Sequence, residues 1–507
     1  MATPTTEAPA RGGIELNGIN TISESERKGK ASSLFWPWFA ANVSVLGIGY
    51  GSFLLVFKIS FVQAVVVGVI GIVISFVLCG FVAIAGKRGS APTMVLSRAA
   101  FGVRGNGVPS VLSWILTVGW ETVLTSLAAL ATATVFTRLG WNGGDVTKAV
   151  ALVVVALLII AGGVLGFKVI MRLQQWITIA TGVLTVVYII LTLGHVNWTA
   201  LAALPSGNLP AVIGGLVFMM TGFGLGWVNA ASDYSRYLPR STKSSSVVGW
   251  TAFGSSVAPV ILLIFGLMLA GSSAKLNGAI YNDPIGALSS ILPVWFLIPF
   301  ILVAILGLIG GAVLDIYSSG LALLTAGIRI PRPAAAGIDG VIMILGSIYV
   351  VFIASDFFFP FQGFLITLGV PVAAWCGIFL ADIAMRKKNY SEKDLYTSRG
   401  RYGAVRWSAI ILIVVGTVVG WGFVTNTYAP WLEWQGFFFG PASDAKLHVI
   451  NGFRDTWGGA NLGVLFALVI GFVGTLIFGR AAVRRQEALP TDDGLAVVEE
   501  PVGVPQP

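Results

Sequence analysis

Long apolar runs are the feature that most constrains this 507-residue chain. A hydrocarbon core of roughly 30 Å needs about 20 mostly apolar residues for each helix that crosses it. Runs of that length also favour helices over strands, which are shorter. We therefore expect an all-α integral membrane protein. Its 12 predicted transmembrane helices lie at residues 35–57, 61–86, 109–137, 149–167, 174–194, 210–231, 247–270, 294–326, 340–358, 361–385, 407–428 and 460–479.

The composition excludes an ordinary soluble enzyme. Charged residues make up 10% of the chain, against about 25% in a typical soluble domain, and the mean hydropathy is +0.87. So few charges cannot coat a water-facing surface of this size. The two cysteines, Cys79 and Cys376, both lie in apolar runs. We therefore expect no disulfide framework, no metal cluster and no cofactor.

The basic residues predict how the chain is oriented. If the N-terminus is cytoplasmic, 25 of the 31 Lys and Arg residues fall in cytoplasmic segments and 6 fall outside. Cytoplasmic loops of membrane proteins carry such an excess of positive charge. This explains the net charge of +9 without nucleic acid as a partner. We expect a multi-pass protein of the plasma (inner) membrane with both termini in the cytoplasm. The polar tails, residues 1–33 and 481–507, are expected to be disordered.

Two glycine runs indicate an internal repeat. Residues 47–51 and 222–226 both read Gly-x-Gly-x-Gly, and their first glycines are 175 residues apart. The runs lie in the first and the sixth predicted helix, five helices apart in the order, so the second enters the membrane from the opposite side. This arrangement is typical of an inverted five-plus-five repeat. We expect the first repeat at 34–200, the second at 201–386, and two further helices within 387–480.

The same glycines predict two broken helices. Each glycine costs a continuous helix roughly 0.8–1 kcal/mol, and unwound main chain is tolerated within a membrane only around a polar cavity. We therefore expect main-chain groups at Gly47, Gly49 and Gly224 to bind a ligand. Close packing of helices is the alternative explanation of these glycines.

Two carboxylates lie deep in predicted helices. Glu121 is in the third and Asp315 in the eighth, where a charged side chain costs about 2.5–3.5 kcal/mol. Burial disfavours the charged form of a carboxyl group, so either residue could carry a proton. A structural hydrogen bond is the alternative role for Glu121. Asp356 and Asp382 lie nearer helix ends, where water or basic loop residues can solvate them.

Two tryptophans mark a candidate site for a flat ligand. Trp120 adjoins Glu121, and Trp227 directly follows the second glycine run. A heteroaromatic ligand gains roughly 0.5–1.5 kcal/mol from each well-placed ring. We expect both indoles to stack on the substrate, and core packing is the alternative.

Charged residues near the cytoplasmic ends of the predicted helices are candidates for an inner gate. Asp233 follows the sixth helix, and Arg98 and Arg236 are its candidate partners. An ion pair between Asp233 and either arginine would close the site from the cytoplasm. A helix cap, together with the positive charge of cytoplasmic loops, is the alternative explanation.

Five stretches carry a family resemblance: residues 38–42 (Trp-Phe-Ala-Ala-Asn), 97–102, 119–120, 226–237 and 316–318. They resemble nucleobase–cation symport family 1, and specifically its purine–cytosine permease branch. The resemblance runs from about residue 30 to 480. It implies a LeuT-like fold of ten core helices plus two C-terminal helices, and inward transport of a nucleobase or related heterocycle with a cation. It also implies that Trp120 and Trp227 sandwich the substrate.

The chain departs from the family near the substrate and cation sites. Leu124 stands where fungal-type members have Asn, and Gly311 and Asp315 stand where those members have two further Asn residues. Sodium-coupled hydantoin members place adjacent hydroxyls at the positions of Ile309 and Gly310, which have no side-chain oxygen. Since a sodium site needs several oxygen ligands, we expect H⁺ rather than Na⁺ as the coupled cation, with Asp315 or Glu121 as its carrier.

The sequence thus predicts a secondary active transporter that imports a cytosine-type or purine-type nucleobase through the lipid bilayer by alternating access. Carriage of another planar heterocycle, such as a hydantoin, allantoin or a vitamin precursor, is the alternative within this fold, as is sodium coupling. An amino-acid carrier would leave the two tryptophans without a role. A membrane enzyme would need a nucleophile–base or metal-binding motif, which the predicted helices lack, and a sensor would need a soluble output domain.

Overall fold

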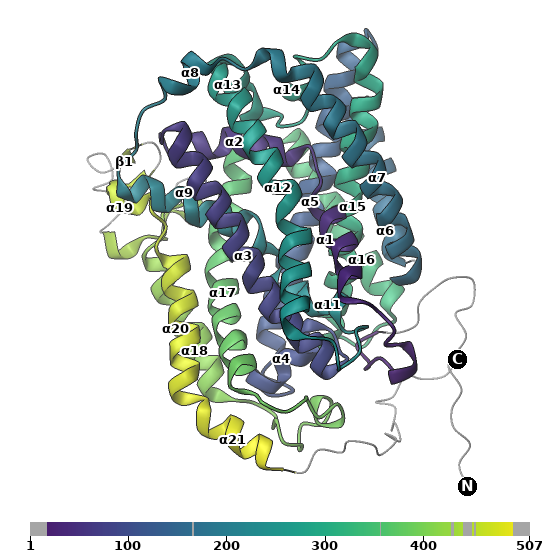
Figure 1. Ribbon diagram of the computed structural model, residues 1–507, viewed down its shortest axis with the longest axis vertical. Coiled ribbons are helices and arrows are strands. Elements are labelled where there is room, and N and C mark those ends of the chain that lie inside the picture. The colour runs from purple at the N-terminus through teal and green to yellow at the C-terminus, as the bar shows by residue number, and fades with distance from the viewer. Residues whose placement is uncertain are drawn as a thin grey trace.

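The computed structural model describes residues 18–164, 167–354, 356–426, 430–439, 449–450 and 453–489. These residues form a helical bundle, and the strands among them are β1 (Val449–Ile450) and β2 (Phe453–Arg454), which pair antiparallel in a loop (Figure 1). Nine of the described helices are long and apolar enough to cross a membrane. Two pairs of helices that meet at a bend, Ala31–Asn42 with Leu46–Leu55 and Gly463–Phe478 with Arg480–Ala488, raise this number to 11 if each pair is one span. Trp407–Gly422 is a shorter apolar helix. This is consistent with the 12 predicted helices, and the all-α membrane fold is confirmed.

The predicted first repeat, residues 34–200, holds α1 (Phe35–Asn42), α2 (Leu46–Leu55), α3 (Phe61–Gly89), α4 (Thr93–Phe101), α5 (Gly107–Arg138), α6 (Asp145–Val164) and α7 (Phe167–Thr192). Helix α8 (Trp198–Ala202) spans its predicted boundary with the second repeat, residues 201–386, which holds α9 (Leu209–Gly222), α10 (Gly224–Trp227), α11 (Ala231–Ser235), α12 (Ser244–Ser272), α13 (Ala274–Asn282), α14 (Gly286–Ser289), α15 (Leu297–Thr325), α16 (Arg332–Phe352) and α17 (Phe358–Met385). The remaining α-helices are α18 (Trp407–Gly422), α19 (Asp455–Gly458), α20 (Gly463–Phe478) and α21 (Arg480–Ala488). Short 3₁₀ helices are η2 (Glu24–Glu26), η3 (Ala31–Leu34), η4 (Leu193–His195), η5 (Val228–Ala230), η6 (Val294–Phe296), η7 (Lys393–Leu395), η8 (Pro430–Leu432) and η9 (Phe437–Phe439).

The two halves of the bundle make the same contacts with the roles exchanged. Helix α12 of the second half packs along α1 and α2 of the first, and α3 of the first half packs along α9, α10 and α11 of the second. Likewise, α15 packs against α6 and α7, while α5 packs against α16 and α17. Each contact therefore has a counterpart between the corresponding helices of the two halves, as an inverted repeat requires. The corresponding helices α5 and α15 pack directly against each other.

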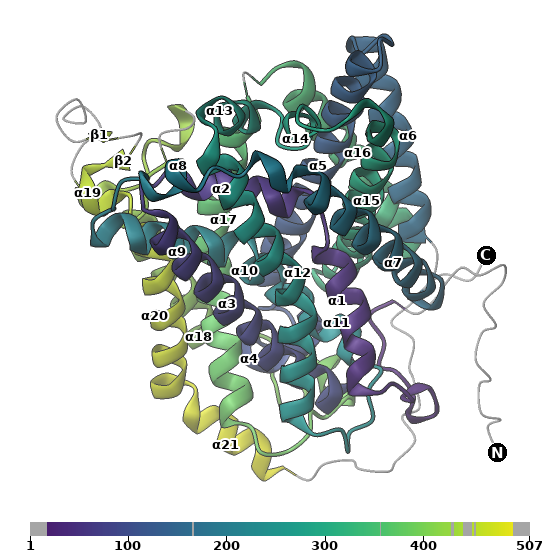
Figure 2. The same ribbon diagram turned by 45° about the horizontal axis from the view of Figure 1, so that its top comes forward.

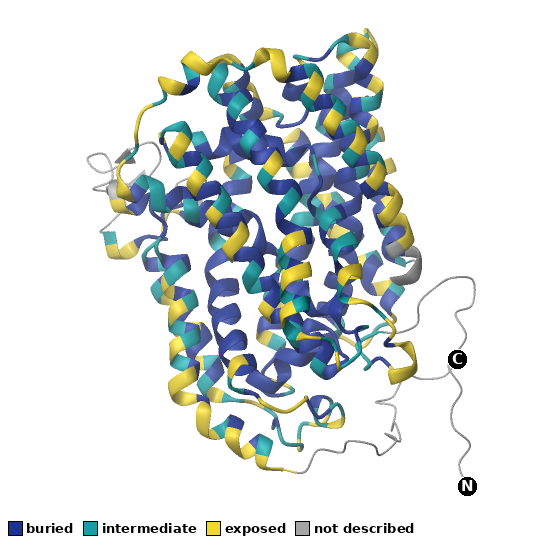
Figure 3. Cartoon of the chain, in the orientation of Figure 1, coloured by how far each residue is buried: buried dark blue, intermediate teal, exposed yellow. Residues whose placement is uncertain are grey.

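The bundle is layered by polarity as a membrane protein should be. Buried residues follow the middle of the bundle, and exposed residues lie along its edges (Figure 3). The exposed residues of the outer helices are apolar, for example Leu157 on α6 and Leu345 on α16. Lipid tails can cover such side chains without cost. Helices α8, α13 and α14 lie across one end of the bundle (Figure 2).

The polar segments at both ends of the described chain are more ordered than the sequence predicts. Arg27 is buried, and its Nε and Nη2 donate hydrogen bonds to the carbonyl oxygen of Leu238 at 3.0 and 2.7 Å. At the other end, Gln486 in α21 accepts a 2.6 Å hydrogen bond from Arg386. The predicted disorder is therefore wrong for residues 18–33 and for 481–489, because their polar groups bond to the helix ends they cover. The remaining tail residues lie outside the described part of the chain.

Candidate substrate and coupling site

The first broken helix lies between α1 and α2, and these helices meet at 64°. The break falls at residues 43–45, and Val43 has φ −84° and ψ 72°, which is not helical. The last carbonyl groups of α1 point at glycines of α15. The oxygens of Ala40 and Ala41 lie 3.6 Å from where a β-carbon would stand at Gly310 and Gly311, respectively. The glycines of α15 thus leave room for the unwound end of α1.

The sequence predicted that the glycine run at residues 47–51 would form this break, but it does not. It lies inside α2 and packs closely on neighbouring segments. A β-carbon at Gly47 would stand 3.0 Å from Leu262, and one at Gly49 would stand 3.3 Å from Pro284. The main-chain N–H of Gly47 already donates to the Ser44 carbonyl oxygen at 2.8 Å. Gly47 and Gly49 therefore serve helix packing, which was the alternative explanation, and offer no bare main chain here.

The second broken helix is interrupted inside its glycine run, as the sequence predicts. Asn208 caps the start of α9 by accepting a hydrogen bond from the N–H of Ala211 at 3.1 Å, and Pro210 stands in the first turn. The helix ends at Gly222, because Phe223 takes φ −120° and ψ −103°. Helix α10 then resumes at Gly224, which lies directly against the main chain of Ser75 on α3.

Side chains, rather than a bare cavity, satisfy the main-chain groups at this second break. The Tyr50 hydroxyl donates to the Gly222 carbonyl oxygen at 3.1 Å. The Gly224 N–H donates to Ser75 Oγ at 3.1 Å, and Cys79 Sγ donates to the Gly224 carbonyl oxygen at 3.0 Å. The expectation that main chain at Gly224 is open to a ligand is therefore not met in this conformation.

The structure places Trp120 beside the segment that carries Trp227. A β-carbon at Gly226 would stand 3.0 Å from Trp120 Nε1. The Trp227 ring meets Trp38 edge-on at 5.8 Å between centroids, and the Trp120 ring meets Phe361 edge-on at 5.5 Å. Trp120 and Trp227 keep partial exposure, whereas Trp38 is fully buried. Both indoles therefore keep part of their surface uncovered by protein, unlike Trp38.

Glu121 and Asp315 come from α5 and α15, which are corresponding helices of the two halves. Both side chains are buried, and none of their four carboxyl oxygens has a hydrogen-bond partner. Asp315, Asp339 and the Ser319 hydroxyl lie near the Glu121 carboxyl group. A buried carboxylate without partners is costly, so these groups need a bound cation, a proton or a polar ligand. Within the described residues, no three acidic, histidine or cysteine side chains are grouped to hold a metal ion.

Asp339 and Gln362 are polar residues that the sequence analysis missed. Asp339 lies two turns inside α16, because that helix begins at Arg332 instead of the predicted residue 340. Its carboxylate accepts hydrogen bonds from Trp114 Nε1 at 2.6 Å and from Ser319 Oγ at 2.7 Å. Gln362 follows Phe361 in α17, is buried, and has neither amide atom hydrogen-bonded. The sequence signal that could have identified Gln362 was a single amide side chain within an apolar run.

At Gly310, one of the two positions where sodium-coupled hydantoin members have hydroxyls, a side-chain amide approaches from another helix. Gln174 of α7 donates from Nε2 to the Gly310 carbonyl oxygen at 2.6 Å. Ile309 and Gly310 themselves supply no side-chain oxygen. The donor thus stands where α15 meets the end of α1.

The candidate gate residues lie together but do not form the predicted ion pair. Asp233 Oδ1 accepts from the main-chain N–H and the hydroxyl of Thr93, at 2.7 and 2.8 Å, and so caps the start of α4. Arg98 donates to the main-chain oxygens of Leu395 and Thr325, and Arg236 donates to the Tyr317 hydroxyl at 2.6 Å. The helix cap is thus the role that Asp233 has in this conformation.

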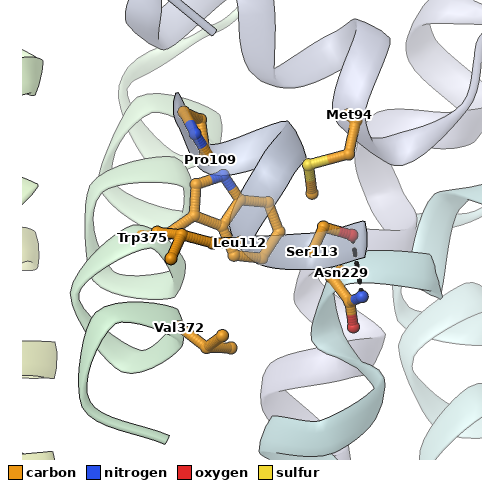
Figure 4. A pocket seen from close by; sticks show the side chains of 7 residues that line it. All are labelled: Met94, Pro109, Leu112, Ser113, Asn229, Val372 and Trp375. Carbon is orange, nitrogen blue, oxygen red and sulfur yellow. Dashed lines mark hydrogen bonds between the residues drawn. The ribbon is translucent and has the colours of Figure 1, made fainter. Parts of the chain in front are cut away.

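A small cavity lies between α4, α5, η5 and α17 (Figure 4). Asn229 Nδ2 donates to Ser113 Oγ at 2.8 Å at its edge, and Trp375 forms one wall. The volume in which the centre of a water molecule can lie is about 10 Å³. This is room for about one water. This cavity is therefore too small to hold a heterocycle.

Two interrupted helices in opposed halves, with Trp120 beside the second of them, define a multi-pass membrane transporter rather than an enzyme. Comparison with known families identifies which transporter family this is. Residues 21–438 match the family described as permease for cytosine/purines, uracil, thiamine, allantoin. The protein belongs to this permease family, as the sequence resemblance predicts.

Curated relatives agree with this assignment. The protein named "Putative purine-cytosine permease YxlA" of Bacillus subtilis (strain 168) is 24% identical over 425 residues, which is 82% of this chain and 89% of that protein. The purine-cytosine permease FCY2 of Saccharomyces cerevisiae is 27% identical over 290 residues, covering 53% of this chain and 49% of that protein.

Solved structures confirm the fold. Mhp1, a nucleobase-cation-symport-1 family transporter in a closed conformation with bromovinylhydantoin bound, has a TM-score of 0.65 at 18% identity, covering 94% of this chain and 100% of that chain. A Na⁺-coupled sialic acid symporter has a TM-score of 0.58 at 13% identity, covering 90% of this chain and 91% of that chain. The chain therefore has the LeuT-like fold that the sequence predicts.

Proposed function

We propose that this permease imports a nucleobase of the cytosine or purine type across the plasma membrane, coupled to protons, by alternating access. The observation that carries the proposal is the placement of Trp120 against Gly226, the residue before Trp227, with both indoles only partly buried. Two neighbouring indoles suit a flat, heteroaromatic ring. The names of the relatives from B. subtilis and S. cerevisiae point to the same class of substrate.

Glu121 and Asp315 support the coupling to protons. Each is buried with both carboxyl oxygens unpaired, and burial favours the neutral, protonated form of such a group. In the proposed cycle, one carboxylate takes a proton from outside and the nucleobase stacks on the tryptophans. The bundle then rocks to open the site inward. Proton and substrate are coupled because both favour the same conformation.

The surroundings of Gly310 support H⁺ over Na⁺. A sodium ion at the end of α1 would need several oxygen ligands, but Ile309 and Gly310 of α15 supply no side-chain oxygen there. Gln174 of α7 donates from Nε2 to the Gly310 carbonyl oxygen, and its unpaired Oε1 is the one side-chain oxygen that we find beside Gly310 among the described residues. Sodium coupling is the alternative that the experiment below tests.

The proposed orientation has both termini in the cytoplasm. It rests on the 25 to 6 division of Lys and Arg residues between the two sides. Asp233, Arg98 and Arg236 then lie at the cytoplasmic end of the bundle, where we place the inner gate. In this conformation the gate is held by the cap of Asp233 on α4 and by the hydrogen bonds of the two arginines.

Uptake by the purified protein in proteoliposomes tests the proposal. We expect labelled cytosine or hypoxanthine to accumulate when the outside is more acidic than the inside, and replacement of Na⁺ by choline to have no effect. Strict dependence on Na⁺ would reject proton coupling. Failure of both bases to enter under any gradient would reject the nucleobase assignment.

A different planar heterocycle is the second candidate for the substrate. The family description includes uracil, thiamine and allantoin, and the Mhp1 structure contains a hydantoin. Competition decides between the candidates. The true substrate should inhibit uptake of a labelled base at the lowest concentration in a panel of cytosine, hypoxanthine, uracil, allantoin, thiamine and a hydantoin.

A further inference from the structure

Asp339 lies outside the substrate site but connects to it through one hydroxyl. The Ser319 hydroxyl on α15 donates to Asp339 Oδ2 at 2.7 Å and lies near the unpaired Glu121 carboxyl group on α5. Trp114, almost two turns before Glu121 in α5, donates to the other oxygen of Asp339 at 2.6 Å. Glu121, Ser319 and Asp339 are each fully buried. One row of buried polar groups thus crosses three helices.

The row runs from the middle of the bundle toward the end where α15 terminates and α5 and α16 begin. Ser319 is one turn beyond Asp315 in α15, and Asp339 is two turns from the start of α16. This end carries the candidate gate residues. The row therefore leads from the proposed proton carrier to the proposed cytoplasmic side.

We propose that Ser319 and Asp339 form the exit relay for the transported proton, with Glu121 as its donor. This inference rests on the proposed function. Ser319 passes its hydroxyl proton to Asp339 Oδ2 and at the same time takes the proton of Glu121, so that Ser319 stays neutral. Glu121 becomes a carboxylate and Asp339 a carboxylic acid, which then releases its proton to water at that end when the inner gate opens. Atoms and charge balance at each transfer.

The charged groups around Asp339 suit this role. From α5 it faces Glu121 and the neutral donor Trp114, and from α15 it faces Ser319. On α16 itself, Arg332 lies over the Tyr317 ring at 4.4 Å and donates to the Gly163 carbonyl oxygen at 3.1 Å. Helix α6 meets α16 through Ile160 and Gly340. Its Asp145 and Lys148 pair with each other about 20 Å further along the helix.

A purely structural role for Asp339, as an anchor of α16 on α5, is the competing explanation. Asp339→Asn separates the two, because an amide keeps hydrogen-bonding groups at this position but cannot carry a proton. Ser319→Ala removes the link, and Ser319→Thr restores a hydroxyl. Ser347→Ala is the matched control, since Ser347 is also a buried serine between α16 and α5, donating to the Thr122 carbonyl oxygen at 3.2 Å, but lies outside the row.

The experiment compares two assays in proteoliposomes. Counterflow exchange of labelled cytosine needs no net proton movement, whereas accumulation under a pH gradient does. For Asp339→Asn and Ser319→Ala we expect counterflow within about twofold of wild type and gradient-driven accumulation, with substrate-induced proton entry, reduced by about tenfold or more. Ser319→Thr should recover accumulation, and Ser347→Ala should retain both activities.

Two outcomes would overturn the relay. One is wild-type accumulation and proton entry in both Asp339→Asn and Ser319→Ala. The other is equal loss of counterflow and accumulation with a lowered melting temperature, which is what an anchor would give. A wild-type protein that transports without proton movement rejects the proposed coupling, and the relay with it, before any variant is measured.

Discussion

Trp120 lies against Gly226, with its indole nitrogen 3.0 Å from the place that a β-carbon at residue 226 would occupy. The two residues come from α5 and α10, on opposite halves of the inverted repeat. The helix is interrupted at Phe223, three residues earlier. The last glycine of the run therefore shapes the space beside an aromatic ring, whereas Gly224 permits close packing on α3.

Gly226→Ala should weaken substrate binding with little loss of stability. The added methyl group must displace Trp120 by a few tenths of an ångström, so we expect KM for the nucleobase to rise by about three- to tenfold while kcat changes little. Concentration-dependent uptake measures both quantities. Gly249→Ala in α12 is the control, because a β-carbon there has no neighbour within 4 Å. An unchanged KM in Gly226→Ala would mean that the Trp120 ring does not contact the substrate.

Trp227→Ala should abolish uptake but leave the protein in the membrane. The variant loses the stacking energy, roughly 0.5–1.5 kcal/mol, together with the apolar area of the ring, so uptake should fall by about tenfold or more. Trp227→Phe should recover part of it. Uptake and surface labelling are measured on the same cells. Trp407→Ala on α18 is the control, since that indole is 69% exposed at the bundle surface. Wild-type uptake by Trp227→Ala would reject the stacking role.

The architecture could be predicted from the sequence because each element depends on local composition. The lengths of the apolar runs predict the helices, and two glycine runs with the same internal spacing predict the inverted repeat. The second break also coincides with its glycines. The first does not: it falls at residues 43–45, which include two valines and carry no glycine. A glycine can allow the backbone to unwind or allow close packing. For residues 47–51, only the segments that pack against them in the folded protein show that close packing is the role.

The site could be predicted only in part, because its contacts are made between distant helices. Trp120 and Glu121 were visible as polar or large residues in an apolar run. Asp339 was not, since the predicted helix started one residue after it and the aspartate was assigned to a loop. Its partners, Trp114 and Ser319, are 225 and 20 residues away in sequence. No pattern in one helix encodes such a pairing.

Glu121→Gln and Asp315→Asn should separate the roles of the two unpaired carboxyl groups. Because Glu121 lies near Ser319, we expect Glu121→Gln to lose pH-driven accumulation while counterflow continues. Asp315→Asn should keep pH-driven accumulation and change the preference among nucleobases, since it alters the donors facing the ring. Asp145→Asn, at the exposed start of α6, is the control. The reverse result, with coupling lost only in Asp315→Asn, would assign the proton to Asp315.

Asp382→Ala should destabilise the fold far more than its predicted place near a helix end suggested. Asp382 is buried and pairs with Arg386 at 2.6 Å, and Arg406 approaches it at 3.7 Å. Burial alone would lower the pKa of Arg386, but the charge and hydrogen bonds of Asp382 raise it above its usual value. The arginine therefore stays charged, and removing Asp382 leaves that charge buried.

Breaking such a pair costs about 3–5 kcal/mol, so the melting temperature of the detergent-solubilised variant should drop sharply at neutral pH. The double variant Asp382→Ala/Arg386→Met should recover much of the loss, because it removes the stranded charge as well as its partner. Glu24→Ala is the matched control: Glu24 also pairs with arginines, but its side chain is 66% exposed, and exposed pairs contribute about 0–1 kcal/mol. Equal melting temperatures for Asp382→Ala and Glu24→Ala would show that the buried pair is solvated, and that Arg386 can reach water once Asp382 is gone.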